Sequence, residues 1–287
     1  MGSAEQESRA VPTRPMEFDS CFGDVPRHFA GNGDLLLSHV FTVLSSVFPD
    51  GEAYFVRSVD AVRDRITDPR LRQEVEGFIG QETMHGREHA VFNEHLAGLG
   101  YPVRPIGTYI RTLTWLRERF LNEKANLAVT AALEHYTATL AETLLREPEA
   151  RAAIGHDGAR HLFLWHALEE AEHKAVAFDV YRHLGGTERM RIITMWVIHL
   201  NFVLETSIWT VISLGLDPAA RRHPVRVLRS LWRLRRSPFT SLRAVRQLLR
   251  YHRRGFHPCD CDSNELISNW RAKLFGSEGA LSDVLVT

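Results

Sequence analysis

Two copies of the pattern Glu-x-x-His constrain this chain more than any other feature. They are Glu82-Thr-Met-His85 and Glu170-Ala-Glu-His173, and each stands in a stretch that favours a helix. Residues three apart on an α-helix lie on one face, so the carboxylate and imidazole of each copy converge on one point. A further glutamate precedes each copy, Glu52 before the first and Glu134 before the second. This order predicts a dinuclear metal site between four helices.

The spacing of the glutamates supports the same arrangement. The step from Glu52 to Glu82 is 30 residues and that from Glu134 to Glu170 is 36, which suits a helix, a loop and an antiparallel helix in each case. The step of 52 residues from Glu82 to Glu134 suits a long crossover connection. The alternative is an all-helical protein whose glutamates lie on solvated faces. One Glu-x-x-His would favour that alternative, whereas two copies with paired upstream glutamates favour the metal site.

The types of side chain indicate which metals the site would bind. Mixed carboxylate and imidazole donors suit iron, with manganese as a rival and zinc as a further option. The three cysteines, Cys21, Cys259 and Cys261, lie away from the motifs, which argues against a structural zinc or an iron–sulfur site. We therefore expect two Fe ions, with Mn or a mixed Fe/Mn pair as the alternatives.

The phrases around these residues resemble a known family. The overall pattern is that of ferritin-like diiron carboxylate proteins, and the phrases are similar to a bacterial family described as "predicted metal-dependent hydrolase" over roughly residues 15–270. The phrases are Phe48-Pro-Asp-Gly-Glu-Ala-Tyr-Phe55, Gln81-Glu-Thr-Met-His-Gly-Arg-Glu-His89, Leu133-Glu-His-Tyr136 and Trp165-His-Ala-Leu-Glu-Glu-Ala-Glu-His-Lys174. The resemblance implies metal ligands at Glu52, Glu82, His85, Glu134, Glu170 and His173.

Each Glu-x-x-His helix carries one more histidine on the same face. His89 follows His85 by four residues, and His166 precedes Glu170 by four. We expect both to hydrogen-bond to the ligands, since metal-binding side chains normally need such partners. The alternative is that one of them binds metal, which by resemblance is a feature of some diiron N-oxygenases.

Other polar residues near the motifs are weaker candidates. Glu169 precedes His173 by four residues and is a rival to Glu170 for the metal. Asp179 is a candidate partner of a ligand, with an ordinary ion pair on a helix face as the alternative. His135 is adjacent to Glu134, so it must point about 100° away and is not expected to bind metal.

Local signals predict an all-α fold, a ferritin-like four-helix bundle with additional C-terminal helices. We expect helices over residues 34–48, from 52 onwards after a break at Pro49-Asp50-Gly51, and over 67–96, 108–120, 123–145, 160–184 and 188–216. The expected organisation is an N-terminal tail and lead-in over residues 1–33, disordered as far as Arg14, the metal-binding bundle over 34–186, and an extension packed on the bundle over 187–287.

The C-terminal third differs from the rest of the chain in charge and hydropathy. Residues 188–216 are long and apolar enough to cross a bilayer, but His199, Asn201 and Glu205 favour a helix packed on the bundle. Residues 218–259 contain twelve arginines, no lysine and no acid, whereas the remaining chain has 23 basic and 35 acidic residues. Packing of this basic segment on the acidic bundle, or on a partner in a homodimer, is therefore favoured.

The sequence also bears on contact with a membrane, contact with nucleic acid and the location of the protein in the cell. Peripheral contact of residues 218–254 with an anionic membrane is the alternative to packing, because apolar residues alternate with the arginines. Nucleic acid is not expected, since no recognised binding motif accompanies them. The cysteine usage and the absence of a signal-peptide pattern predict a cytoplasmic protein, with membrane association as the alternative.

The preferred functional interpretation is a non-haem diiron oxidase or oxygenase. It would use O2 as co-substrate to oxidise a small organic molecule, and an external donor would supply electrons where the substrate does not. A dinuclear metal-dependent hydrolase is the first alternative, because two metals can share a hydroxide and polarise an ester, amide or phosphoryl bond. A ferritin-like iron-handling protein is the second.

Overall fold

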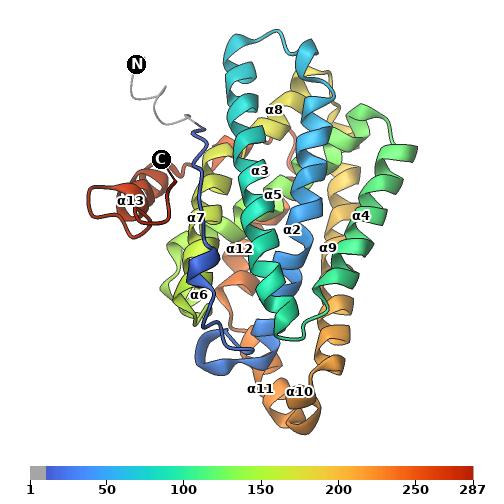
Figure 1. The fold of residues 1–287 in the computed structure, drawn as a ribbon. Coiled ribbons are helices and arrows are strands. Elements are labelled where there is room, and N and C mark those ends of the chain that lie inside the picture. Colours follow the sequence, from blue (N-terminus) through green and yellow to red (C-terminus); the bar gives the residue numbers. More distant parts are fainter. Residues whose placement is uncertain (1–10, 287) are drawn as a thin grey trace.

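A computed structural model describes residues 11–286, and all the long secondary-structure elements in this part of the chain are helices (Figure 1). Its only β pairing consists of two isolated bridges, so the predicted all-α class is confirmed. The longer helices are α2 (Leu35–Asp60), α3 (Pro69–Gly98), α4 (Val103–Phe120), α5 (Glu123–Arg146), α7 (Asp157–His173) and α9 (Glu188–Leu216). The shorter ones are α6 (Pro148–Ala152), α8 (Val176–His183), α10 (Pro218–Arg222), α11 (Pro224–Leu234), α12 (Leu242–Arg250) and α13 (Asn264–Phe275).

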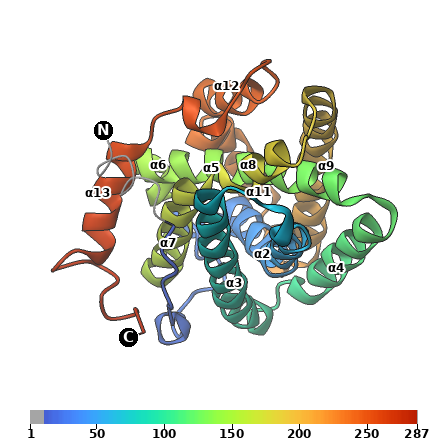
Figure 2. The ribbon, with the colours of Figure 1, turned by 90° about the horizontal axis from the view of Figure 1, so that it is seen from above.

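Four of these helices, α2, α3, α5 and α7, carry the predicted metal ligands. α2 packs along α3, α5 packs along α7, and contacts of α2 with α5 and of α3 with α7 complete the group. Figure 2 shows α2, α3, α5 and α7 next to one another in the view from above. The long connection between α3 and α5 contains α4, which lies against α2. The likeness to ferritin-like proteins beyond this arrangement stays a prediction.

Side-chain caps explain where three of these helices begin. The Asp34 carboxylate accepts from the backbone N–H of Leu37 at the start of α2, and Asp68 accepts from Arg70 before α3. The Asn122 side chain does the same for α5. Short polar side chains satisfy N–H groups that have no partner within the helix, so these sequence signals set the helix ends.

The break expected at Pro49 is wrong, because α2 continues through it. A proline inside a helix leaves the carbonyl four residues earlier without its N–H donor. Here that carbonyl belongs to Ser45, and the Asn93 side-chain nitrogen on α3 donates to it at 2.9 Å. The neighbouring helix therefore replaces the missing hydrogen bond, and Glu52 stays in the same helix as Ser45.

A second difference concerns the helix expected over residues 160–184. It begins at Asp157 and is divided after His173, where α7 ends; α8 begins at Val176, after two intervening residues. No proline or glycine marks this break. At the break the buried Lys174 ammonium contacts the Glu142 carboxylate at 2.9 Å and the Cys261 carbonyl at 2.7 Å. These long-range contacts hold the chain at the end of α7.

The N-terminal segment does more than lead into the bundle. Met16, Phe18, Phe22 and Phe29 are buried in the core shared with α3 and α7. Arg14 lies within 2.7–2.9 Å of two carboxylates of α7, so the expectation of a disordered tail reaching Arg14 is wrong. Residues 1–10 lie outside the described part.

The apolar helix α9 packs against α2 and α5 through one face, as the sequence analysis favoured. Met195, Ile198, Thr210 and Ser213 are buried on this face. By length and composition it is the one helix in the described part that could cross a membrane, and 17% of its most apolar stretch is buried. Few of its residues are therefore fully buried, although its composition is that of a core helix.

Candidate metal centre

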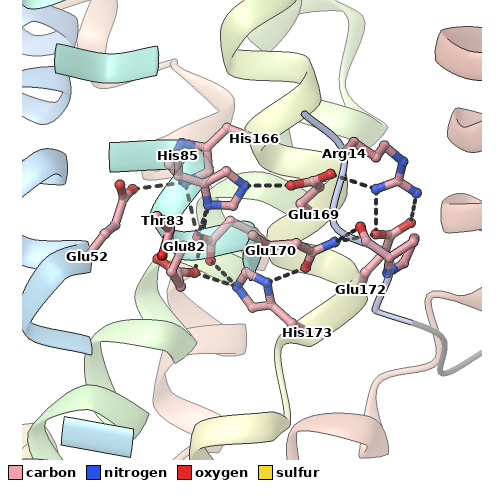
Figure 3. A network of polar contacts seen from close by, with 12 residues as sticks. Arg14, Glu52, Glu82, Thr83, His85, His166, Glu169, Glu170, Glu172 and His173 are labelled. Atoms are coloured by element: carbon pink, nitrogen blue, oxygen red, sulfur yellow. Dashed lines mark hydrogen bonds and ion pairs between the residues drawn. The ribbon is translucent and has the colours of Figure 1, made fainter. Parts of the chain in front are cut away.

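Four buried glutamates meet between α2, α3, α5 and α7, and Figure 3 labels three of them, Glu52, Glu82 and Glu170. Each is 1% exposed: Glu52, Glu82, Glu134 and Glu170. Both oxygens of the first three, and Oε2 of Glu170, have no hydrogen-bond partner among the described residues. Burying carboxylates without partners is very costly, because a buried charge needs an opposite charge or a metal. The cluster therefore has the donors and the unmet charge that bound cations would satisfy.

His173 points its Nε2 atom at three of these carboxylates. Nε2 lies 3.0 Å from Glu82, 3.3 Å from Glu134 and 3.7 Å from Glu170. The opposite ring nitrogen, Nδ1, lies 2.8 Å from the Gln81 side-chain oxygen. The Gln81 nitrogen donates to the Glu172 carboxylate at 2.9 Å, which fixes its oxygen as the acceptor for His173. Nδ1 thus carries a proton, and Nε2 is the nitrogen available to a metal.

His85 has the same arrangement with the two ring nitrogens exchanged. Its Nε2–H faces the Glu169 carboxylate at 3.1 Å, and Glu169 in turn accepts from Arg14 at 2.7 Å. Nδ1 has no hydrogen-bond partner within residues 11–286 and lies 3.7 Å from Glu82 and 4.0 Å from Glu170. A carboxylate behind a histidine fixes its orientation and makes it a better metal donor.

His166 is the third histidine that faces the cluster, and a chain of hydrogen bonds decides its tautomer. The Asn93 nitrogen donates to a carbonyl, so the Asn93 oxygen must accept from the Ser45 hydroxyl at 2.8 Å. That hydroxyl then accepts from His89 Nδ1 at 2.9 Å. Burial, with His166 as a further cause, holds the pKa of His89 well below its usual value, so His89 is neutral and its Nε2 accepts.

The end of this chain sets the inward nitrogen of His166. His166 Nδ1 donates to His89 Nε2 at 2.8 Å. Burial, followed by the effect of His85, lowers the pKa of His166, so its Nε2 has a free lone pair. This lone pair lies 3.0 Å from one oxygen of Glu170 and 3.6 Å from one of Glu52. A lone pair that faces carboxylate oxygens is repelled unless a cation lies between them.

The donors fall into two groups, as expected for two metal positions. Within each group the candidate ligand atoms lie within 4.8 Å of one another: Glu52, His85 and His166 in one, and Glu82, Glu170 and His173 in the other. Glu170 has one oxygen near His166 and the other near His173, so it spans both positions. Glu134 lies beside the second group through its contact with His173.

The pKa values of the cluster express its excess of negative charge. Burial, with Glu170 and Glu82 adding to it, raises the pKa of Glu134 to about 8. Burial and then Glu82 raise the pKa of Glu52 well above its usual value. Although burial lowers it, hydrogen bonds to Glu169 and Glu82 raise the pKa of His85 to about 10. Protons on these side chains partly replace the charge that metal ions would supply.

All six implied ligands thus lie in one cluster, and the additional candidates take different places. Glu169 is behind His85 rather than among the inward carboxylates, which leaves Glu170 as the inward member of that pair. His89 is behind His166. Asp179 pairs with His257 at 2.7 Å and is not in the cluster. His135 points away to the Gln247 carbonyl at 3.0 Å, as expected.

Sequence reasoning missed the residues that hold the histidines in place. Gln81 and Glu172 are each adjacent to a predicted ligand, and both hydrogen-bond on the outer side of the cluster. Arg14 lies far away in the sequence and contacts both Glu169 and Glu172. The position of Gln81, four residues before His85, was the one available signal, because it places Gln81 on the ligand face.

A cavity of about 660 Å³ adjoins the cluster. Glu52, His166 and Glu170 form part of its wall, and the rest is largely hydrocarbon from α2, α4, α5 and α9. Its polar groups away from the cluster include Arg117 and Glu205. The cavity has the size of a small-molecule site, and its walls favour an apolar ligand.

Comparison with protein families identifies the chain's relatives. The model of the family described as "Predicted metal-dependent hydrolase" matches residues 12–262. The chain belongs to this family. The match covers all four ligand helices and confirms the resemblance carried by the motif phrases. Comparison with curated proteins and with solved structures gives no match.

Proposed function

We propose that this chain is a dinuclear metal-dependent hydrolase whose substrate places an apolar portion in the cavity. The observation that carries the proposal is the set of three inward histidine nitrogens facing four buried glutamates at the inner wall of that cavity. Membership of the metal-dependent hydrolase family favours hydrolysis over the oxidation first preferred from the motifs.

The proposed ligands divide between the two positions. Glu52, His85 and His166 would hold one metal, Glu82, Glu134 and His173 would hold the other, and Glu170 lies between the two groups. Bound metals would supply a Lewis acid and lower the pKa of a coordinated water. The cavity borders Glu52, His166 and Glu170, so the scissile group binds at this side of the cluster. The apolar walls orient the substrate by its hydrocarbon portion and exclude other water.

Oxidation remains a second candidate because of one observation. The walls next to the cluster are hydrocarbon over most of their area, and they offer few groups that could hold a polar ester or amide. A carboxylate-rich donor set on helices suits iron, and such a cavity suits oxidation of an apolar substrate. In that case the chain needs an external electron donor or a substrate that supplies electrons.

Metal substitution separates the two reactions. The apoprotein is loaded with Zn(II) or with Fe(II), and metal content, release of p-nitrophenol from acyl esters of increasing length, and O2 uptake are measured. Hydrolysis by the zinc form, with a preference for long acyl chains, supports the proposal, because zinc does not change oxidation state. O2 uptake by the iron form without hydrolysis by either form refutes it in favour of oxidation.

Variants test the ligand set independently of the substrate. Glu82→Ala, His173→Ala and His166→Ala should each lower the metal content of the protein below two ions per chain. His89→Ala should weaken metal binding roughly 10- to 100-fold through His166. His135→Gln, one residue from Glu134 but facing Gln247, is the matched control and should keep both ions. A His166→Ala protein that binds two metals with unchanged affinity would remove His166 from the ligand set.

A further inference from the structure

The outer face of α9 is an uninterrupted apolar stripe. Six side chains at steps of three or four residues are each 47–68% exposed: Ile193, Val197, Leu200, Leu204, Ile208 and Val211. They lie on one side of the helix and extend over about 27 Å, at 1.5 Å per residue. A helix that is apolar on both faces is normally buried in a core or a membrane, so one face of α9 lacks a partner in the described protein.

The helices that follow α9 carry arginines beside exposed apolar side chains. On α11, Val225, Leu228 and Trp232 are 52–64% exposed, and an exposed arginine follows each of them by one position. On α12, Leu242 and Val245 are likewise exposed and are followed by exposed arginines. An apolar stripe next to an arginine stripe is the pattern of helices that lie in a membrane interface.

Helices α11 and α12 pack against the bundle helices α2 and α5, but the arginines contribute little to that contact. All twelve arginines of residues 218–259 are exposed. Among the described residues, Arg243 alone of the twelve pairs with a carboxylate, Glu147 at 3.5 Å. The buried contacts of α11 and α12 are instead made by small residues, Ser230 and Ala244. The basic charge therefore remains available to an anionic partner.

We propose that the exposed stripes of α9, α11 and α12, here called the C-terminal surface, bind the surface of an anionic lipid bilayer. Figure 2 shows α9 and α12 along the side of the molecule opposite α3. An anionic bilayer offers both a medium for the apolar stripes and counter-charges for the arginines. A second copy joined by two-fold symmetry would place the same basic surface against itself, which is unfavourable.

The cavity connects the C-terminal surface with the metal cluster, so bilayer binding would serve substrate delivery. This step rests on the proposed function. Val211 belongs to the α9 stripe and also lines the cavity, and Leu231 on α11, which is 52% exposed, lines the cavity as well. The cavity continues inward to Glu52 at the metal cluster. A bilayer-bound protein therefore receives an amphiphilic, long-chain substrate from the lipid side without passing it through water.

Vesicle flotation with the full chain tests the binding without any activity measurement. Vesicles of phosphatidylcholine alone are compared with vesicles containing phosphatidylglycerol, at 0.1 and 0.5 M NaCl. Binding should need the anionic lipid and weaken at high salt, because arginine–lipid attraction is screened. One basic residue near an anionic surface contributes about fivefold to partitioning, so Arg229→Glu/Arg233→Glu should lower it at least about 25-fold.

Two more variants separate the stripe from the charge. Leu200→Asp/Leu204→Asp should abolish binding while circular dichroism and metal content stay unchanged, because both residues are exposed and neither lines the cavity. Arg63→Glu/Arg70→Glu makes the same change of charge at exposed residues before and at the start of α3 and should bind as the wild type does. Equal binding to neutral vesicles, no binding to either, or a stable dimer that the Leu200→Asp/Leu204→Asp change dissociates would overturn the proposal.

Discussion

The hydrogen bond from Asn93 to the Ser45 carbonyl should be coupled energetically to Pro49. In the wild-type chain Pro49 has no N–H, and the Asn93 side chain is the donor that reaches this buried carbonyl, at 2.9 Å. Asn93→Leu keeps roughly the same volume but leaves the carbonyl without a donor. A buried polar group without a partner costs about 1–3 kcal/mol, and the Ser45 hydroxyl also loses its acceptor. We expect the variant to lose about 3 kcal/mol of unfolding free energy.

The test is a double-mutant cycle with Pro49→Ala. Alanine at 49 restores a backbone N–H four residues after Ser45, so the carbonyl regains a donor within α2. Asn93→Leu should then cost only about 1–2 kcal/mol, which gives a coupling of about 1–2 kcal/mol between the two positions. Urea unfolding of the metal-free proteins measures all four free energies. Costs that add to within about 0.5 kcal/mol would refute the assignment of Asn93 as the replacement donor.

Three further predictions concern charge and metal. Binding of two metals to the apoprotein near pH 7 should release protons, since the pKa of His85 is raised to about 10 and that of Glu134 to about 8. Calorimetry in buffers of different ionisation enthalpy should show the release of at least one proton per chain. Burial lowers the pKa of His135 from 6.5 to about 4, so its neutral form stabilises the fold above pH 6.5. About 3 kcal/mol of unfolding free energy should be lost as the pH falls toward 4. Urea titrations at several pH values should show a smaller loss for His135→Gln. Lys174→Met leaves the Glu142 carboxylate buried without its ammonium partner and should cost about 3–5 kcal/mol by thermal or urea unfolding, whereas Glu142→Leu/Lys174→Met should cost less.

The helices that carry the candidate ligands could be predicted because their signals are local. The Glu-x-x-His spacing places both donors on one face whatever the rest of the chain does, and Asp68-Pro69 and Asn122 are caps that act within one turn. The break expected at Pro49 failed for the opposite reason. The residue that makes the proline acceptable, Asn93, lies 44 positions away and on another helix. The division after His173 is likewise set by Lys174 and its distant partners.

The same distinction explains which parts of the metal centre the motifs could predict. A motif can indicate that His166 lies on the ligand face, but its tautomer depends on His89, Ser45 and Asn93, which belong to two other helices. The sequence alone therefore could not decide whether His166 is a metal ligand or a hydrogen-bond partner of one. The sequence also could not predict what the arginines contact. Charge asymmetry alone favours packing of the arginines on the acidic bundle, whereas in the fold the small buried residues of α11 and α12 make that contact.

Hydrogen bonds behind the three histidines link Pro49 to the candidate metal centre. Each inward nitrogen depends on an outer acceptor: Glu169 for His85, Gln81 for His173, and His89 for His166. The first two acceptors are held by Arg14 and Glu172. The third is oriented through Ser45 by Asn93, and Asn93 is itself oriented by the carbonyl that Pro49 leaves free. The Ser45 carbonyl thus orients the side-chain amide of Asn93. That amide sets the tautomer of His166 through the hydrogen bonds of Ser45 and His89. Asn93→Leu, which removes the acceptor of the Ser45 hydroxyl, should therefore weaken metal binding as well as folding, and an Asn93→Leu protein with wild-type metal affinity would show that this chain does not set the tautomer.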